Sequence, residues 1–208
     1  MSTQAQRATL QRRPLVKKIL AGADDNLLVI AGLGSANWDI TAAGDRPLNM
    51  PLWGAMGAPV AMGLGLAMAQ PRKRVLVITG DGDMLMSLGA LATVATQQPD
   101  NLAIVVLDNE KFGETGNQAT HTSPRNNGPT DSGAGTDLAM IARGCGIADS
   151  ATVREAGEVA QLVTDARTKK GPVFRLVKVM VEKLEFVMPP QDGAHLKDRF
   201  RQALLGHA

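Results

Sequence analysis

The sequence contains no tyrosine, and aromatic residues make up only 3% of its 208 residues. Proteins that bind single-stranded nucleic acid stack the bases on aromatic side chains and surround them with clustered Lys and Arg. Here Lys and Arg number 22 against 20 Asp and Glu, and no long basic block occurs. We therefore expect no nucleic-acid partner.

Cysteine is almost absent as well. Cys145 stands alone, which excludes an internal disulfide framework and fits a reducing compartment. No apolar run approaches the roughly 20 residues that span a bilayer. We expect a cytoplasmic protein without a membrane segment. Acids are also missing before Asp24 while five Arg and Lys occur there, a pattern shared by transit peptides and by the solvated face of a basic helix.

Apolar segments alternate with helical ones along the chain. The segments 26–34, 74–82, 101–109 and 172–181 are near-continuous apolar runs, which is typical of parallel strands buried on both faces. Helical patterns cover about 5–20 and the segments 59–70, 83–98, 138–146 and 155–171. The sequence therefore predicts an α/β fold, a parallel sheet with helices on both faces, as one domain over 1–208.

Polar residues follow two of these strands. Asp81 ends one predicted strand and Asn109 ends the next. If the strands are neighbours, both side chains lie at one sheet edge, where ligands of such folds bind, and their oxygens suit Mg²⁺. Gly80 and Gly82 permit a tight turn, and we expect Asp83 to cap a helix that begins at Met84, whose free N–H groups would bind an anion.

Two other functions compete for these residues. "GLGSANWD" loosely matches a dinucleotide-binding turn, but Asn37 stands where the third glycine belongs. Asp81 and Asp83 imitate the acidic pair of a phosphatase, without the later acidic pair that such enzymes need. A polar stretch of roughly 28 residues follows Asn109, and a loop of that length is usually functional or disordered. We expect an active-site loop over about 110–135.

The run from Gly80 to Gly82, with Asn109 after 26 intervening residues, resembles the motif of thiamine-diphosphate-dependent enzymes. The resemblance implies the diphosphate-binding domain of that family, with thiamine diphosphate and Mg²⁺ as cofactors. It implies that Asp81, Asn109 and the main-chain carbonyl of Lys111 bind Mg²⁺. Backbone N–H groups of Gly82 and Asp83 would bind the diphosphate.

Other residues fall where this family contacts its cofactor. In "WGAMG" the resemblance implies that Met56 supports the bent cofactor while Gly54 and Ala55 lie beside the aminopyrimidine. The remaining expected cofactor contacts are Ser35, Asn37, Gly80, Thr115 and Gly116, and the expected catalytic residues are Glu114 and His121. A lone histidine in a loop is also often merely solvated, so both interpretations of His121 stay open.

Enzymes of this family use a second, pyrimidine-binding domain whose glutamate activates the cofactor. This chain is too short for both domains, and its six glutamates do not fall where that residue would. We therefore expect a hetero-oligomer in which a separate alpha subunit supplies the glutamate.

The segments "GDGDMLMSLGALATVA" and "LDNEKFGETGNQAT" are most similar to the β subunits of sulfopyruvate decarboxylases and to phosphonopyruvate decarboxylases. This resemblance implies a β subunit that decarboxylates a small 2-oxo acid, with a lyase, synthase or oxidative decarboxylase subunit as the alternative. A catalytically silent binding subunit is the alternative of another class.

Overall fold

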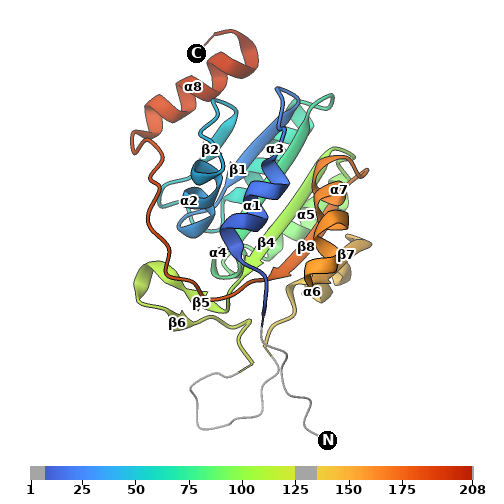
Figure 1. Cartoon of the computed structure of the whole chain (residues 1–208). Helices are drawn as coiled ribbons and strands as arrows, with labels where there is room; N and C mark the ends of the chain where they lie inside the picture. The colour runs from blue at the N-terminus through green and yellow to red at the C-terminus, as the bar shows by residue number, and fades with distance from the viewer. Residues whose placement is uncertain (1–7, 125–134, 208) are drawn as a thin grey trace, which may run out of the picture.

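The computed structural model describes residues 8–124 and 135–207. In it the four predicted strands form the centre of one parallel sheet (Figure 1). The sheet has the order β2-β1-β3-β4-β8-β7, and all neighbouring pairs are parallel. Its strands are β1 (Leu27–Ala31), β2 (Asn49–Pro51), β3 (Arg74–Gly80), β4 (Leu102–Asp108), β7 (Asp149–Val153) and β8 (Val173–Lys178).

Helices cover both faces of this sheet, which confirms the predicted fold class. Along β4, Ala103, Val105 and Leu107 belong to one buried apolar cluster, while Leu102 and Ile104 belong to the other. Alternate side chains of a strand point to opposite faces of the sheet. A strand that is apolar at every residue, such as β4, is therefore covered on both of its faces. The first face carries α1 (Arg12–Leu20), α2 (Ser35–Ala42) and α7 (Val159–Arg167), and the second α3 (Pro59–Ala69), α5 (Gly89–Gln97) and α6 (Leu138–Gly144).

Helix α1 is shorter than the predicted span of about 5–20. It begins at Arg12, because Leu10 forms an isolated parallel bridge with Val179 after β8. The N–H of Met180 also donates to the Leu10 carbonyl at 2.9 Å. This pairing holds residues 8–11 extended and brings the start of α1 to the carboxyl end of the sheet; residues 5–7 lie outside the described part of the chain.

The predicted helix over 83–98 is two helices, α4 (Asp81–Leu85) and α5, separated by turns over 86–88. Gly89 follows that break, and glycine is a poor helix former. The break ends α4 at the sheet edge and lets α5 pack on the second face.

The carboxyl edge of the sheet carries two further segments, at the lower side of Figure 1. The described part of the predicted loop forms a hairpin of β5 (Lys111–Phe112) and β6 (Gln118–Ala119), joined through a short 3-10 turn, η1 (Gly113–Thr115). The C-terminal segment, residues 179–192, then crosses the edge and leads to α8 (Gly193–Leu205) beside β2. Among the described residues no helix is both long and apolar enough for a membrane span.

Candidate functional site

Strands β3 and β4 are neighbours, in the register Gly80 opposite Leu107. Asp81 and Asn109 therefore leave adjacent strands at the same edge, as the sequence predicted. Asp81 is only 1% exposed, whereas Asn109 is half-buried and lines the same cavity. One carboxylate and one amide oxygen donor thus face a shared space.

Two threonines hold the Asp81 carboxylate. Thr120 Oγ1 donates to Asp81 Oδ2 at 2.5 Å, and Thr122 Oγ1 lies 2.9 Å from the same oxygen. Thr122 Oγ1 lies equally close, 2.9 Å, to Oδ1 of Asp108. Burial raises the pKa of Asp81 to about 7 and the charge of Asp108 adds to the rise, while the hydroxyl groups oppose it. A divalent cation beside Asp81 would favour its charged form.

A half-buried lysine completes this network on the far side of Asp108. Lys178 Nζ lies 2.7 Å from Asp108 Oδ2 and 2.8 Å from Glu110 Oε1. The sequence analysis missed Thr120, Thr122, Asp108 and Lys178. The "THT" triplet was visible in the predicted loop, but nothing local shows that this loop returns to Asp81 across 39 residues.

The turn after β4 arranges the predicted metal donors. Glu110 adopts a left-handed backbone with φ of 61°, and the N–H of Lys111 donates to Asn109 Oδ1 at 3.0 Å. A carbonyl oxygen has two lone pairs, so Oδ1 retains one for a cation. No group of three or more His, Cys, Asp or Glu side chains in the described residues is placed to hold a metal. The donors that fit Mg²⁺ here are one carboxylate, one amide and one backbone carbonyl.

Asp83 does not cap a helix that begins at Met84, so that prediction is wrong. Helix α4 begins at Asp81, and the buried Asp83 carboxylate accepts hydrogen bonds from the N–H of Gly57 and from Thr79 Oγ1. Burial raises the pKa of Asp83. A side chain at Gly32 would overlap the Asp83 carboxylate. Asp83 therefore ties the Gly57 loop to the start of α4.

The two glycines of the turn have different surroundings. A Cβ at Gly82 would overlap the Phe112 ring, whereas a Cβ at Gly80 would meet no atom within 4 Å among the described residues. Gly82 thus lets the hairpin pack on α4, and Gly80 leaves open space beside N–H groups that the first turn of a helix cannot pair internally.

A cavity of about 960 Å³ lies over this edge. It is lined by ten of the predicted site residues: Ser35, Met56, Gly80, Asp81, Gly82, Asp83, Asn109, Lys111, Glu114 and Thr115. Glu114 reaches from the hairpin to the turn before α2. Its Oε1 lies 2.8 Å from the position that a Cβ at Gly34 would occupy. Burial raises the pKa of Glu114.

The other five predicted site residues, Asn37, Gly54, Ala55, Gly116 and His121, are not among those that line the cavity. Asn37 is fully buried and donates from Nδ2 to the Leu52 carbonyl at 2.7 Å, so its side chain anchors the chain after β2. His121 is exposed, and its carbonyl accepts from the N–H of Thr136 at 2.7 Å. Gly54 and Ala55 precede Met56, and Gly116 follows Thr115.

The C-terminal segment supplies a wall that the sequence analysis did not predict. Residues 181–186 line the cavity together with Trp38 and Arg12. The rings of Trp38 and Phe186 lie 4.2 Å apart between centroids, and Trp53 Nε1 donates to the Pro190 carbonyl at 3.0 Å. This segment has no helical or strand periodicity that could have located it.

The fold is a parallel α/β sheet with polar strand ends that face a cavity at its carboxyl edge, where ligands of such sheets bind. Residues 34–177 match the family model described as "Thiamine pyrophosphate enzyme, C-terminal TPP binding domain", thiamine pyrophosphate being another name for thiamine diphosphate. The chain belongs to this family, which confirms the resemblance predicted from the sequence.

Relatives of the chain include proteins named as subunit beta of sulfopyruvate decarboxylase. The chain is 32% identical over 197 residues to sulfopyruvate decarboxylase subunit beta of Methanothermobacter thermautotrophicus, covering 95% of this chain and 97% of that protein. It is 36% identical over 137 residues to the same subunit of Methanocaldococcus jannaschii, covering 66% of this chain and 67% of that protein. Against phosphonopyruvate decarboxylase of Streptomyces viridochromogenes the identity is 29%, over 89% of this chain but only 44% of that protein.

The solved structure of a putative thiamin diphosphate-dependent enzyme from Mycobacterium smegmatis shares this fold. The two chains superpose with a TM-score of 0.63 at 20% identity, over 88% of this chain and 37% of that one.

Proposed function

We propose that this chain is the β subunit of a thiamine-diphosphate- and Mg²⁺-dependent 2-oxo acid decarboxylase. The observation that carries the proposal is the pairing of Asp81 and Asn109 at the ends of neighbouring strands. The similarity to sulfopyruvate decarboxylase β subunits over nearly the whole chain supports the reaction class.

In this function Asp81, Asn109 and the Lys111 carbonyl hold Mg²⁺, and Thr120 and Thr122 orient the Asp81 carboxylate. Backbone N–H groups after Gly80 bind the diphosphate. Thiamine diphosphate, when bound, supplies the nucleophilic carbon that adds to the substrate ketone and accepts the electron pair left behind by carbon dioxide. Met56 lines the cavity as its apolar support.

Glu114 is the candidate for moving a proton. Glu114 lines the cavity, and partial burial raises the pKa of its carboxyl group. A carboxyl group in such a position can act in proton transfer. His121 does not line the cavity and is the weaker candidate.

The glutamate that activates the cofactor comes from a separate alpha subunit. Glu110 is paired with Lys178, Glu158 accepts backbone hydrogen bonds at the start of α7, and Glu182 accepts from the N–H of Arg12. These side chains have structural partners. The chain also spans only 44% of the phosphonopyruvate decarboxylase that it matches.

The test is to purify the tagged chain from its native host with Mg²⁺ and thiamine diphosphate, and to screen the complex against 2-oxo acids. A stoichiometric partner and release of carbon dioxide support the proposal. A partner without turnover favours a silent binding subunit, and condensation of two 2-oxo acids favours a synthase. Failure of the pure chain and of the complex to bind thiamine diphosphate would reject the proposal.

A further inference from the structure

Arg12 is a buried cation in the wall of the cavity, and none of the functions above uses it. It is 5% exposed and lines the cavity, as do Lys111 and Lys183, which are less buried. Its Nε donates to Asp39 Oδ2 at 2.5 Å, and its backbone N–H donates to Glu182 Oε2 at 2.9 Å. Among residues 8–124 and 135–207, no partner is found for its two terminal nitrogens. These nitrogens are not among the buried polar atoms that lack a partner, so they are open to solvent on the side where Arg12 lines the cavity, and they can donate to an anion there.

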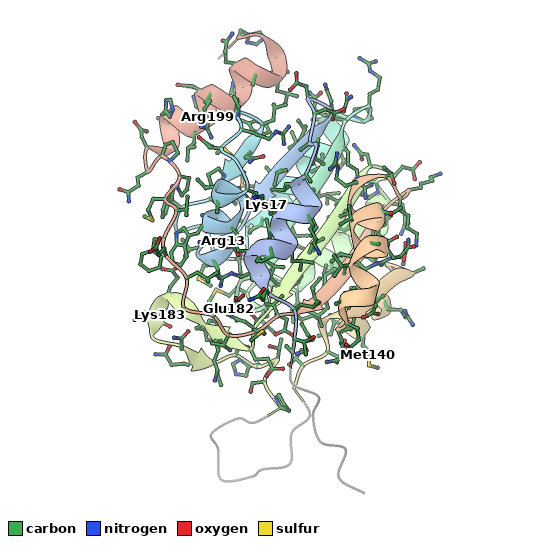
Figure 2. The ribbon with its side chains drawn as sticks, viewed as in Figure 1. Arg13, Lys17, Met140, Glu182, Lys183 and Arg199 are labelled. Atoms are coloured by element: carbon green, nitrogen blue, oxygen red, sulfur yellow. The ribbon has the colours of Figure 1, made fainter. Side chains whose placement is uncertain are left out.

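Asp39 is shared between Arg12 and a second arginine. Arg13 Nε also donates to Asp39, at Oδ1 and 3.0 Å, so two guanidinium groups share the one carboxylate of Asp39. The Glu182 carboxylate accepts from the backbone N–H of Arg12. Burial raises the pKa of Asp39, and both arginines oppose that rise. Within the described residues, no ion pair joins Glu182 to either guanidinium. Figure 2 shows Arg13 at the start of α1 and Glu182 on the segment that passes below it.

The position of Asp39 places these arginines near the start of α2, which lines the cavity. Asp39 lies four residues after Ser35 on α2, and side chains at that spacing lie on one helix face about one turn apart. Ser35 and Ala36, at the start of α2, line the cavity. The Nε of Arg12 is hydrogen-bonded to Asp39, so the terminal nitrogens of the guanidinium are the atoms that remain available to the cavity.

We propose that Arg12 binds an oxyanion of the bound molecules through its terminal nitrogens, with Asp39 as the residue that positions the guanidinium. A planar guanidinium donates two parallel hydrogen bonds to phosphoryl or sulfonate oxygens. The anion belongs either to the cofactor diphosphate or to a second acidic group of the substrate. This assignment of the anion rests on the proposed function.

Arg13 offers a matched control, because it binds the same carboxylate but does not line the cavity. We would compare wild-type chain with Arg12→Gln, Arg12→Lys and Arg13→Gln, first by calorimetric titration with inorganic diphosphate in the presence of Mg²⁺. The complex with its partner would then be assayed with sulfopyruvate and with pyruvate, which lacks a second acidic group. Thermal unfolding checks each variant, and if Arg12→Gln does not fold, Arg12→Lys is compared with Arg13→Lys.

A loss of about tenfold or more in diphosphate affinity for Arg12→Gln, but not for Arg13→Gln, assigns the anion to the cofactor. Unchanged diphosphate affinity with a comparable rise of KM for sulfopyruvate alone assigns it to the substrate. If Arg12→Gln and Arg13→Gln behave alike in both assays, Arg12 only anchors α1 and the inference is overturned, while the decarboxylase stands. Wild-type protein that binds neither Mg²⁺–diphosphate nor thiamine diphosphate would instead remove the proposed function together with the Arg12 site.

Discussion

Thr122 stands between two buried carboxylates, with Oγ1 at 2.9 Å from both Asp81 and Asp108. A hydroxyl group has one proton to donate, so Thr122 donates to one of these two acids at a time, and its hydrogen bond to Asp81 helps to orient that carboxylate. We predict that Thr122→Val raises the Kd for Mg²⁺ about threefold to tenfold, since one net hydrogen bond is worth about 0.5–1.5 kcal/mol. The measurement is a Mg²⁺ titration at constant thiamine diphosphate.

Thr122→Ser is the control, because it keeps the hydroxyl group and removes one methyl. It should retain Mg²⁺ affinity near the wild-type value. Equal Kd values for the Val and Ser variants would show that the hydroxyl does not position Asp81.

Variants of the two glycines beside Asp81 should affect different properties, the stability of the fold in one case and cofactor binding in the other. We predict that Gly82→Ala destabilises the protein by about 1–3 kcal/mol, because its Cβ would overlap the Phe112 ring. Gly80 has φ of −89° and open space around it, so Gly80→Ala should unfold like wild type but bind thiamine diphosphate more weakly. Urea unfolding and cofactor titration of both variants give the comparison. Similar losses of stability in both would contradict it.

At the scale of elements, the sequence predicts what depends on local pattern. The apolar runs located β1, β3, β4 and β8 because strands buried on both faces need no polar alternation. Strands β2 and β7 lie at the sheet edges with few apolar residues and were missed, as were α2 and α8. The paired acid and amide of the site were predicted because both follow such apolar runs.

The rest of the site depends on contacts that are distant in sequence. Thr120 reaches Asp81 across 39 residues, and the N–H of Arg12 reaches Glu182 across 170 residues. Asp83 was misassigned for a related reason: a helix-capping pattern is local, whereas its partners Gly57 and Thr79 come from a loop and a strand.

The entry to α7 gives a prediction for pH. Glu158 Oε2 accepts from the N–H groups of Arg154 and Glu155, both at 2.8 Å, in a capping box before the helix. These bonds lower the pKa of Glu158 below the ordinary value of a glutamate, 4.5. The charged form therefore stabilises the fold above that value, and the contribution is lost as the pH falls through the lowered pKa.

We predict that Glu158→Ala lowers the free energy of unfolding by about 0.5–1 kcal/mol near neutral pH. The difference should shrink as the pH is reduced through that lowered pKa, because the carboxyl group then becomes protonated in the folded state as well as in the unfolded state. Urea unfolding of both proteins near neutral pH and below the lowered pKa measures it. A difference that is constant across this range would mean that the charge of Glu158 does not matter.

At the scale of the whole molecule, exposed apolar side chains surround the cavity. Met56 and Met86 line it from the loop before α3 and from the end of α4, and Val181 and Phe186 line it from the C-terminal segment. Each is between 38% and 68% exposed. Apolar side chains gathered around a site mark an interaction surface, and the proposed alpha subunit must reach this cavity to deliver its glutamate.

Met86 and Met68 provide a matched pair to test where the partner binds. Met86 is 58% exposed at the cavity, and Met68 is 55% exposed near the end of α3, outside the cavity lining. We predict that Met86→Glu weakens association with the partner by about tenfold or more, because a carboxylate must lose its water in the interface. Met68→Glu should leave association unchanged. Analytical ultracentrifugation of both variants without cofactor isolates association from cofactor binding, and equal sedimentation of the two mixtures would place the partner elsewhere on the molecule.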